Sequence, residues 1–157
     1  MTSIKSNKLQ SSRKLVTLSI VLLAAIVTVS GFFLNSLDRN QLVQDFWVDM
    51  FQNDSKVQQD MSRGEATISA EEFASNNTLI AKNVLVIPYY MLIIAVVLSL
   101  IGFLTIGVNP AVATVFLALA GIFSLFTIFP AILLFRASGM LLETIKLEGI
   151  TFTEKAL

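Results

Sequence analysis

Residues 84–135, VLVIPYYMLIIAVVLSLIGFLTIGVNPAVATVFLALAGIFSLFTIFPAILLF, contain no charged side chain. A helix needs about 20 apolar residues, at about 1.5 Å rise each, to cross the hydrocarbon core of a bilayer. The run is long enough for two such helices, and Asn109-Pro110 divides it, because Asn caps helices and Pro suits their first position. The sequence therefore predicts a membrane-spanning helix over 84–106, a tight turn at 107–110 and another helix from Pro110.

The apolar run that starts at Pro110 continues to Leu142 and is interrupted only by Arg136. As one helix its 33 residues would measure roughly 50 Å, but the hydrocarbon core is only about 30 Å thick. Proline favours the first turn of a new helix, so Pro130 indicates that the chain turns back there. This interpretation gives a third span over 110–128 and a fourth over 130–147.

An alternative places residues 130–147 on the membrane surface as an amphipathic helix. Arg136, Glu143 and Lys146 then form a polar stripe along it. If the segment crosses the bilayer instead, Arg136 lies near its outer end and snorkels toward the interface. Tyr89 and Tyr90 fit the aromatic belt of the same interface. The sequence leaves both alternatives open.

A further apolar run, Leu15–Leu34, has twenty residues without a charge and predicts the first span. It exceeds the roughly 7–15 apolar residues of a signal peptide, which favours a retained helix, although cleavage of residues 1–31 as a signal or transit peptide stays open. Before it, residues 1–14 contain Lys5, Lys8, Arg13 and Lys14 and no acid. Basic residues beside a span favour the cytoplasm. We expect a multi-pass protein of the cell (plasma) membrane with a cytoplasmic N-terminus.

The composition excludes most enzyme chemistry. The chain is 55% apolar and 14% charged, where soluble domains average roughly 45–50% and about 25%. Eleven basic and eleven acidic residues give no net charge, which argues against nucleic acid as a partner. The absence of Cys and His removes the common metal, haem and nucleophile sites. We therefore predict no catalytic residue, no metal site and no cofactor.

The polar segment 35–83, predicted to lie outside the cell, has eight acids and four bases. Asn35 or Ser36 could cap a helix over about 37–52 with one apolar face. The candidate partner contacts on this face are Val43, Phe46, Trp47 and Met50. Because surface helices that seek anionic lipid are basic, this acidic helix is expected to pack on protein. Residues 52–68 are expected to form a loop, and the capping box Ser69-Ala70-Glu71-Glu72 to start a helix toward the second span.

The predicted spans contain small residues at helical spacing, such as Ala24 and Thr28 in the first span, and almost no ionisable groups. Ion-coupled transporters place such groups at membrane depth, so transport is disfavoured. Small residues instead allow close approach of helices, within the chain or against a partner. The residues singled out for helix packing are Gly102, Ala113, Ala120 and Ser124.

Apolar motifs near the C-terminus carry a family resemblance. They are Asn109-Pro110, Leu119-Ala120-Gly121-Ile122, the stretch from Phe129 to Leu134, and Gly139-Met140-Leu141-Leu142. With residues 54–72, the stretch 109–142 resembles a family of small Gram-positive multi-pass membrane proteins of unknown function. The resemblance implies one span, an outer polar segment and three closely spaced apolar helices, but no activity. Arg136 departs from it, since the family has an apolar residue there.

These observations predict an all-α integral membrane protein, a small bundle of four transmembrane helices with an amphipathic helix in its outer loop. We expect a non-enzymatic accessory or scaffold component in the lipid bilayer that binds another membrane protein or a second copy of itself. One alternative is a supernumerary subunit of a large respiratory or oxygenase-type membrane complex. Another is an envelope-stress or immunity protein.

Overall fold

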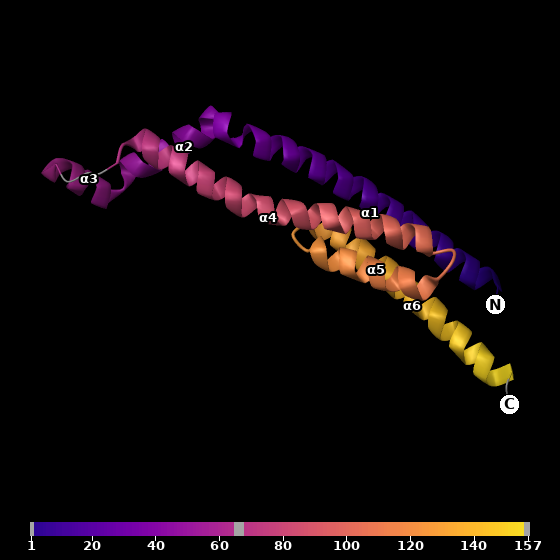
Figure 1. Cartoon of the computed structure of the whole chain (residues 1–157). Coiled ribbons are helices and arrows are strands. Elements are labelled where there is room, and N and C mark those ends of the chain that lie inside the picture. Colours follow the sequence, from indigo (N-terminus) through magenta and orange to yellow (C-terminus); the bar gives the residue numbers. More distant parts are fainter. Residues whose placement is uncertain (1, 65–67, 156–157) are drawn as a thin grey trace. The chain divides into compact units, whose positions relative to one another are not determined.

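The computed structural model describes residues 2–64 and 68–155, and within them the side chains of 6–64 and 68–146. The regular secondary structure of this part of the chain is all helical, as predicted (Figure 1). The elements are α1 (Thr2–Ser36), the short 3₁₀ helix η1 (Leu37–Arg39), α2 (Gln41–Asn53), α3 (Ser55–Arg63), α4 (Ala70–Thr105), α5 (Pro110–Phe123) and α6 (Ile128–Lys155).

Three of the described helices are long and apolar enough to cross a membrane, as expected of a membrane protein. The stretches concerned are Ser6–Arg39, Ala70–Thr105 and Ile128–Lys146. α5 is shorter than the predicted span 110–128, because it ends at Phe123 with Ser124 as its C-cap residue. Its 14 residues measure about 21 Å.

The chain forms two compact units. Unit 1 consists of residues 1–28 and 90–157, and unit 2 of residues 29–89. The division falls within α1 and α4, each of which contributes to both units. The units are described separately below.

Unit 1 has a core in which buried positions alternate three and four residues apart. This spacing is the heptad pattern of left-handed coiled coils, whose seams keep facing one another along supercoiled helices. Many of the positions hold Ala or Ser, which lets the helix backbones approach closely. The buried positions that follow this spacing are Ser12, Val16, Ser19 and Leu23 in α1; Leu92, Ala95, Ser99, Gly102 and Ile106 in and just after α4; Ala113, Leu117, Ala120 and Ser124 in and just after α5; and Leu134, Ala137, Leu141 and Thr144 in α6.

α5 and α6 pack against each other as an antiparallel hairpin (Figure 1). The Ser138 hydroxyl donates to the carbonyl oxygen of Thr114 at 3.1 Å. Closer to the tip of the hairpin, a Cβ at Gly121 would lie 3.0 Å from the Phe135 ring. The absence of a side chain at Gly121 therefore leaves room for this ring. Asn109 starts α5 as predicted, because its side chain accepts the N–H groups of Ala111 and Val112.

α6 also contacts α1 at two places. The Ser19 hydroxyl donates to the Pro130 carbonyl oxygen at 3.1 Å, in a fully buried position. Nearer the start of α1 and farther along α6, the Lys8 ammonium lies 2.7 Å from a carboxylate oxygen of Glu143. These two contacts fix the antiparallel register of α1 and α6.

Unit 2 pairs the end of α1 and all of α2 with the first half of α4. Lys82 forms an ion pair with Asp38, and a Cβ at Gly31 would lie 3.1 Å from the Tyr89 hydroxyl. α2 packs on the same helix, where the rings of Phe51 and Phe73 lie 5.0 Å apart. Phe51 is buried at 4% exposure.

The outer helices begin at other residues than the sequence predicted. α1 continues to Ser36 and η1 follows, so Asn35 and Ser36 do not cap the next helix. Asn40 does, because its side chain accepts the Leu42 N–H at 3.0 Å. α2 therefore starts at Gln41 and not at 37.

α3 lies where a loop was expected. Asp54 accepts the N–H groups of Lys56 and Val57, and Gly64 ends the helix in the left-handed conformation at φ 69°. Ser69 accepts the Glu72 N–H at 3.1 Å, as its capping motif predicted. The helix that follows continues through Pro88 to Thr105.

Candidate functional site

The predicted partner-binding face of α2 is divided into two stripes. Val43 and Trp47 are half-buried and lie on the same face of α2 as Phe51, which packs on α4. Phe46 and Met50, grouped with them by the sequence analysis, lie on another stripe together with Leu42. This second stripe is exposed, at 78% for Leu42, 60% for Phe46 and 53% for Met50. We call Leu42, Phe46 and Met50 the outer stripe of α2.

α2 runs antiparallel to the beginning of α4. The Gln44 amide donates to the Thr78 hydroxyl at 3.4 Å, and Phe51, farther along α2, meets Phe73, which is earlier in α4. Thr78 precedes the apolar run at Val84 by six residues and Phe73 precedes it by eleven, or about 9 and 16 Å along the helix. α2 therefore extends away from the end of the apolar run and does not lie flat across it.

Trp47 links the two stripes. Its ring packs edge-to-face on Phe46, with centroids 5.2 Å apart and planes at 68°. The indole N–H is buried and has no acceptor among the described residues. Aromatic pairs of this geometry are well ordered at low entropic cost, so the exposed Phe46 ring has a fixed support beneath it.

Acidic side chains lie beside the outer stripe on α2 and predominate in unit 2. Unit 2, apart from residues 65–67, has seven acids against four bases. Asp45 and Asp49 lie on α2 itself and are both exposed. The acids are Asp38, Asp45, Asp49, Asp54, Asp60, Glu71 and Glu72, and the bases are Arg39, Lys56, Arg63 and Lys82.

The four residues singled out for helix packing are all buried in unit 1. Ala113, Ala120 and Ser124 have 0% exposure, and Gly102 is buried as well. A Cβ on Gly102 would lie 2.7 Å from the Leu117 Cδ2 atom, which is itself fully buried. The other small residues noted in the first span behave differently, because Ala24 and Thr28 are exposed.

Of the predicted interface residues, Tyr90 is 59% exposed and Arg136 is also exposed. Tyr89 is half-buried and lies against Gly31. Arg136 lies on α6 between Pro130, which contacts Ser19, and Glu143, which contacts Lys8.

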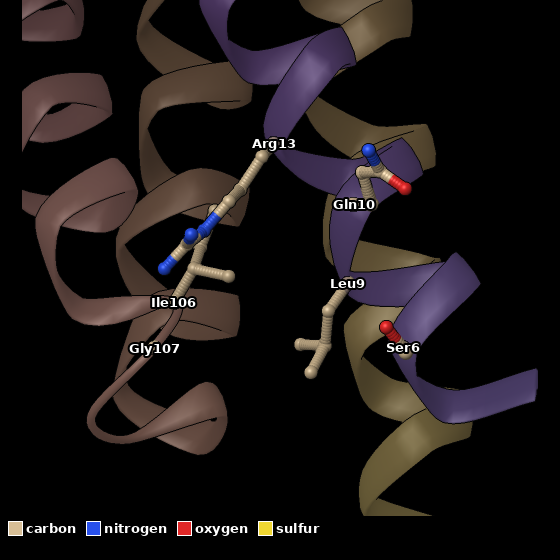
Figure 2. Close-up of a pocket in the computed structure, with 6 residues that line it drawn as sticks. All are labelled: Ser6, Leu9, Gln10, Arg13, Ile106 and Gly107. Carbon is tan, nitrogen blue, oxygen red and sulfur yellow. The ribbon is translucent and has the colours of Figure 1, made fainter. Parts of the chain in front are cut away.

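A cavity of about 410 Å³ opens between the N-terminal part of α1 and the end of α4. Figure 2 shows the Arg13 side chain extending from α1 toward Ile106 and Gly107, with Leu9 pointing into the same space. Ser6 and Gln10 also line it. A Cβ at Gly107 would lie 2.6 Å from an Arg13 Nη atom, so this glycine leaves room for the guanidinium. The donors present suit an anionic group.

Sequence reasoning missed this cavity. Arg13 and Gly107 are far apart in the chain, and no local pattern brings them together. The described residues contain no group of three or more carboxylates able to hold a metal ion. Comparisons with protein families, curated proteins and solved structures found no match to this chain. The resemblance to a Gram-positive membrane family therefore stays a prediction.

Proposed function

We propose that this protein is a non-enzymatic accessory component of a membrane, and that it binds another membrane protein through the outer stripe of α2. The observation that carries the proposal is the exposure of Leu42, Phe46 and Met50 on a helix that extends beyond the apolar run of α4. Large apolar side chains grouped on a surface outside the hydrocarbon core favour a protein partner.

The acidic surroundings of the stripe define the chemistry of the partner. Acidic lipid headgroups would repel Asp45 and Asp49, whereas a protein surface with an apolar groove and flanking Lys or Arg residues would attract them. A groove that accepts an amphipathic helix takes apolar side chains spaced three or four residues apart, and the stripe repeats every four residues. The Phe46–Trp47 pair supplies the rigid aromatic anchor typical of binding hot spots.

The orientation proposed with this function places α2 and α3 outside the cell. It rests on the four bases that precede the first apolar run, since such residues resist translocation. In this arrangement the partner is reached from the outer face of the plasma membrane.

The experiment compares two double variants of the full chain, each with a C-terminal tag and purified from its own membranes in mild detergent. Phe46→Ser/Met50→Ser alters the outer stripe. Met61→Ser/Ile68→Ser removes apolar side chains of 48% and 39% exposure elsewhere in unit 2. We expect a membrane protein in fixed ratio with the wild type and with the second variant, and at least a tenfold loss with the first.

Retention of the partner by Phe46→Ser/Met50→Ser would overturn the proposal. So would a wild type that purifies alone or only with copies of itself, and an isolated chain would favour the stress or immunity alternative. Amide exchange in α2 controls for folding, because exposed positions can change without loss of the helix. A partner that carries a cofactor would make the chain a supernumerary subunit.

A further inference from the structure

The depth that the α5–α6 hairpin reaches can be read from its contacts. Ser19 bonds to Pro130, near the tip of the hairpin, and it lies only four residues past Leu15, where the apolar run of α1 starts. Four residues correspond to about 6 Å of helix. Pro130 therefore lies about 6 Å into that run and far from its end at Leu34.

α4 and α5 give the depth of the hairpin tip independently. Gly102 faces Leu117, three residues before α4 ends at Thr105. α5 ends at Phe123, six residues beyond Leu117. The hairpin thus rises about 14 Å from the end of α4, or roughly half of a hydrocarbon core of about 30 Å.

The charges of α6 agree with this register. Lys8 and Glu143 pair below the apolar run of α1, among its polar N-terminal residues. Arg136 lies six residues from Pro130, or about 9 Å back toward Glu143, which brings it level with Arg13 and Lys14. All these charges then lie on one side of the bilayer, and none has to enter it.

The tip of the hairpin is suited to hydrocarbon and not to water. Its exposed residues are Leu125, Phe126, Ile128 and Phe129, at 59–77% exposure. Inside a bilayer, polar backbone groups in a turn need partners within the protein. Here the Thr127 hydroxyl donates to the Ser124 carbonyl oxygen at 2.7 Å, and the Ser124 hydroxyl donates to that of Gly121 at 3.1 Å.

We infer that α5 and α6 form a re-entrant hairpin that enters the bilayer from the side of the basic N-terminus and turns back near its middle. The acyl chains of that leaflet cover the exposed apolar tip. α6 is long and apolar enough to cross a membrane but does not do so, because its partners α1 and α5 hold its start within one half of the bilayer. This inference does not depend on a partner at α2.

The experiment uses single cysteines, because the natural chain has none. Phe126→Cys probes the tip, Ser62→Cys on α3 reports the outer phase, and Ser11→Cys near the start of α1 reports the inner phase. All three positions are exposed. With a membrane-impermeant maleimide in right-side-out and inside-out vesicles, we expect Ser62→Cys and Ser11→Cys to label from opposite sides. Phe126→Cys should label from neither side until detergent is added.

Labelling of Phe126→Cys from the side that labels Ser62→Cys would show that α6 crosses the bilayer and would overturn the inference. Labelling from the side of Ser11→Cys would place the hairpin on the surface and would overturn it equally.

A second measurement calibrates depth within the protein itself. A nitroxide on Phe126→Cys is compared with nitroxides on the exposed α4 residues Val97 and Val84, each also replaced by cysteine. Val97 is next to the α4 level reached by the end of α5, and Val84 is at the outer end of the run. We expect the ratio of oxygen to nickel-complex accessibility at Phe126 to match that at Val97. A match to Val84 would again overturn the inference.

Discussion

At the scale of single residues, small side chains decide how closely the helices of unit 1 approach. Ser, Ala and Gly occupy core positions where larger residues would hold the backbones apart, and Leu117 fills the space that Gly102 leaves. Serine hydroxyls also bridge helices by donating to backbone carbonyl oxygens, as Ser19 and Ser138 do. The conformation of Gly102 is ordinary helix, so its value lies in its missing side chain and not in its dihedral angles.

Replacement of Gly102 by alanine should therefore destabilise the protein. The added Cβ would meet both Cγ and Cδ2 of the buried Leu117 within 2.8 Å, and overpacking of this kind costs about 1–3 kcal/mol. The measurement is unfolding by a denaturing detergent titrated into mild micelles. Gly139→Ala is the matched control, because nothing lies within 4 Å of its added Cβ and alanine gains about 0.5–1 kcal/mol over glycine in a helix. Equal stability of the two variants would contradict this packing.

At the scale of elements, capping residues and not burial of side chains stabilise α3. None of its described residues is buried, and it has only nine residues, which is short for a stable helix. Asp54 satisfies two N–H groups at its start, and Gly64 adopts a positive φ at its end. α2 resembles it in its Asn40 cap, but α2 also buries Phe51 against α4.

Asp54→Ala should open α3 while α2 stays closed. Loss of an N-cap costs about 1 kcal/mol, which corresponds to a roughly fivefold faster amide exchange over 55–63. Asp60→Ala serves as the control, since it removes a carboxylate from the same helix without removing a cap. Hydrogen exchange with mass spectrometry separates the two variants. If Asp60→Ala exchanged as fast as Asp54→Ala, charge and not capping would be the cause.

At the scale of the whole molecule, the distribution of charge sets the proposed orientation. Bases precede the first apolar run without a single acid, whereas residues 35–83 are acidic overall. Arg13 and Lys14 lie directly at the start of the apolar run. Their charge acts during insertion, before any tertiary contact forms.

Neutralisation of Lys5, Arg13 and Lys14 by glutamine should weaken this orientation and leave the Lys8–Glu143 pair intact. We expect a mixed population, in which labelling of Ser62→Cys in intact cells falls at least twofold. The same number of bases replaced in unit 2, at Arg39, Lys56 and Arg63, should leave labelling unchanged. A fall in the second variant and not in the first would reverse the proposed orientation.

Much of this architecture follows from local sequence. Apolar runs longer than 20 residues predict the long helices, and Asn109 and Ser69 mark helix starts, because a cap acts within four residues of itself. The capping residues of α3, Asp54 and Gly64, are also present in the sequence, but the polar composition of 52–68 predicts a loop there. The first-span small residues Ala24 and Thr28 were interpreted as packing residues, yet α1 buries another face.

The sequence by itself determined the all-helical class, the membrane location and the places where helices start, since these depend on hydropathy and on neighbours along the chain. Only the tertiary structure decided which stripe of α2 is covered, because Phe73 and Thr78 are selected by packing across unit 2. It likewise decided the register of α6, through contacts of Ser19 and Lys8 with residues more than 100 positions away. These contacts join residues that are distant in the chain, so they form only when the helices pack together. No pattern among neighbouring residues in the sequence predicts them.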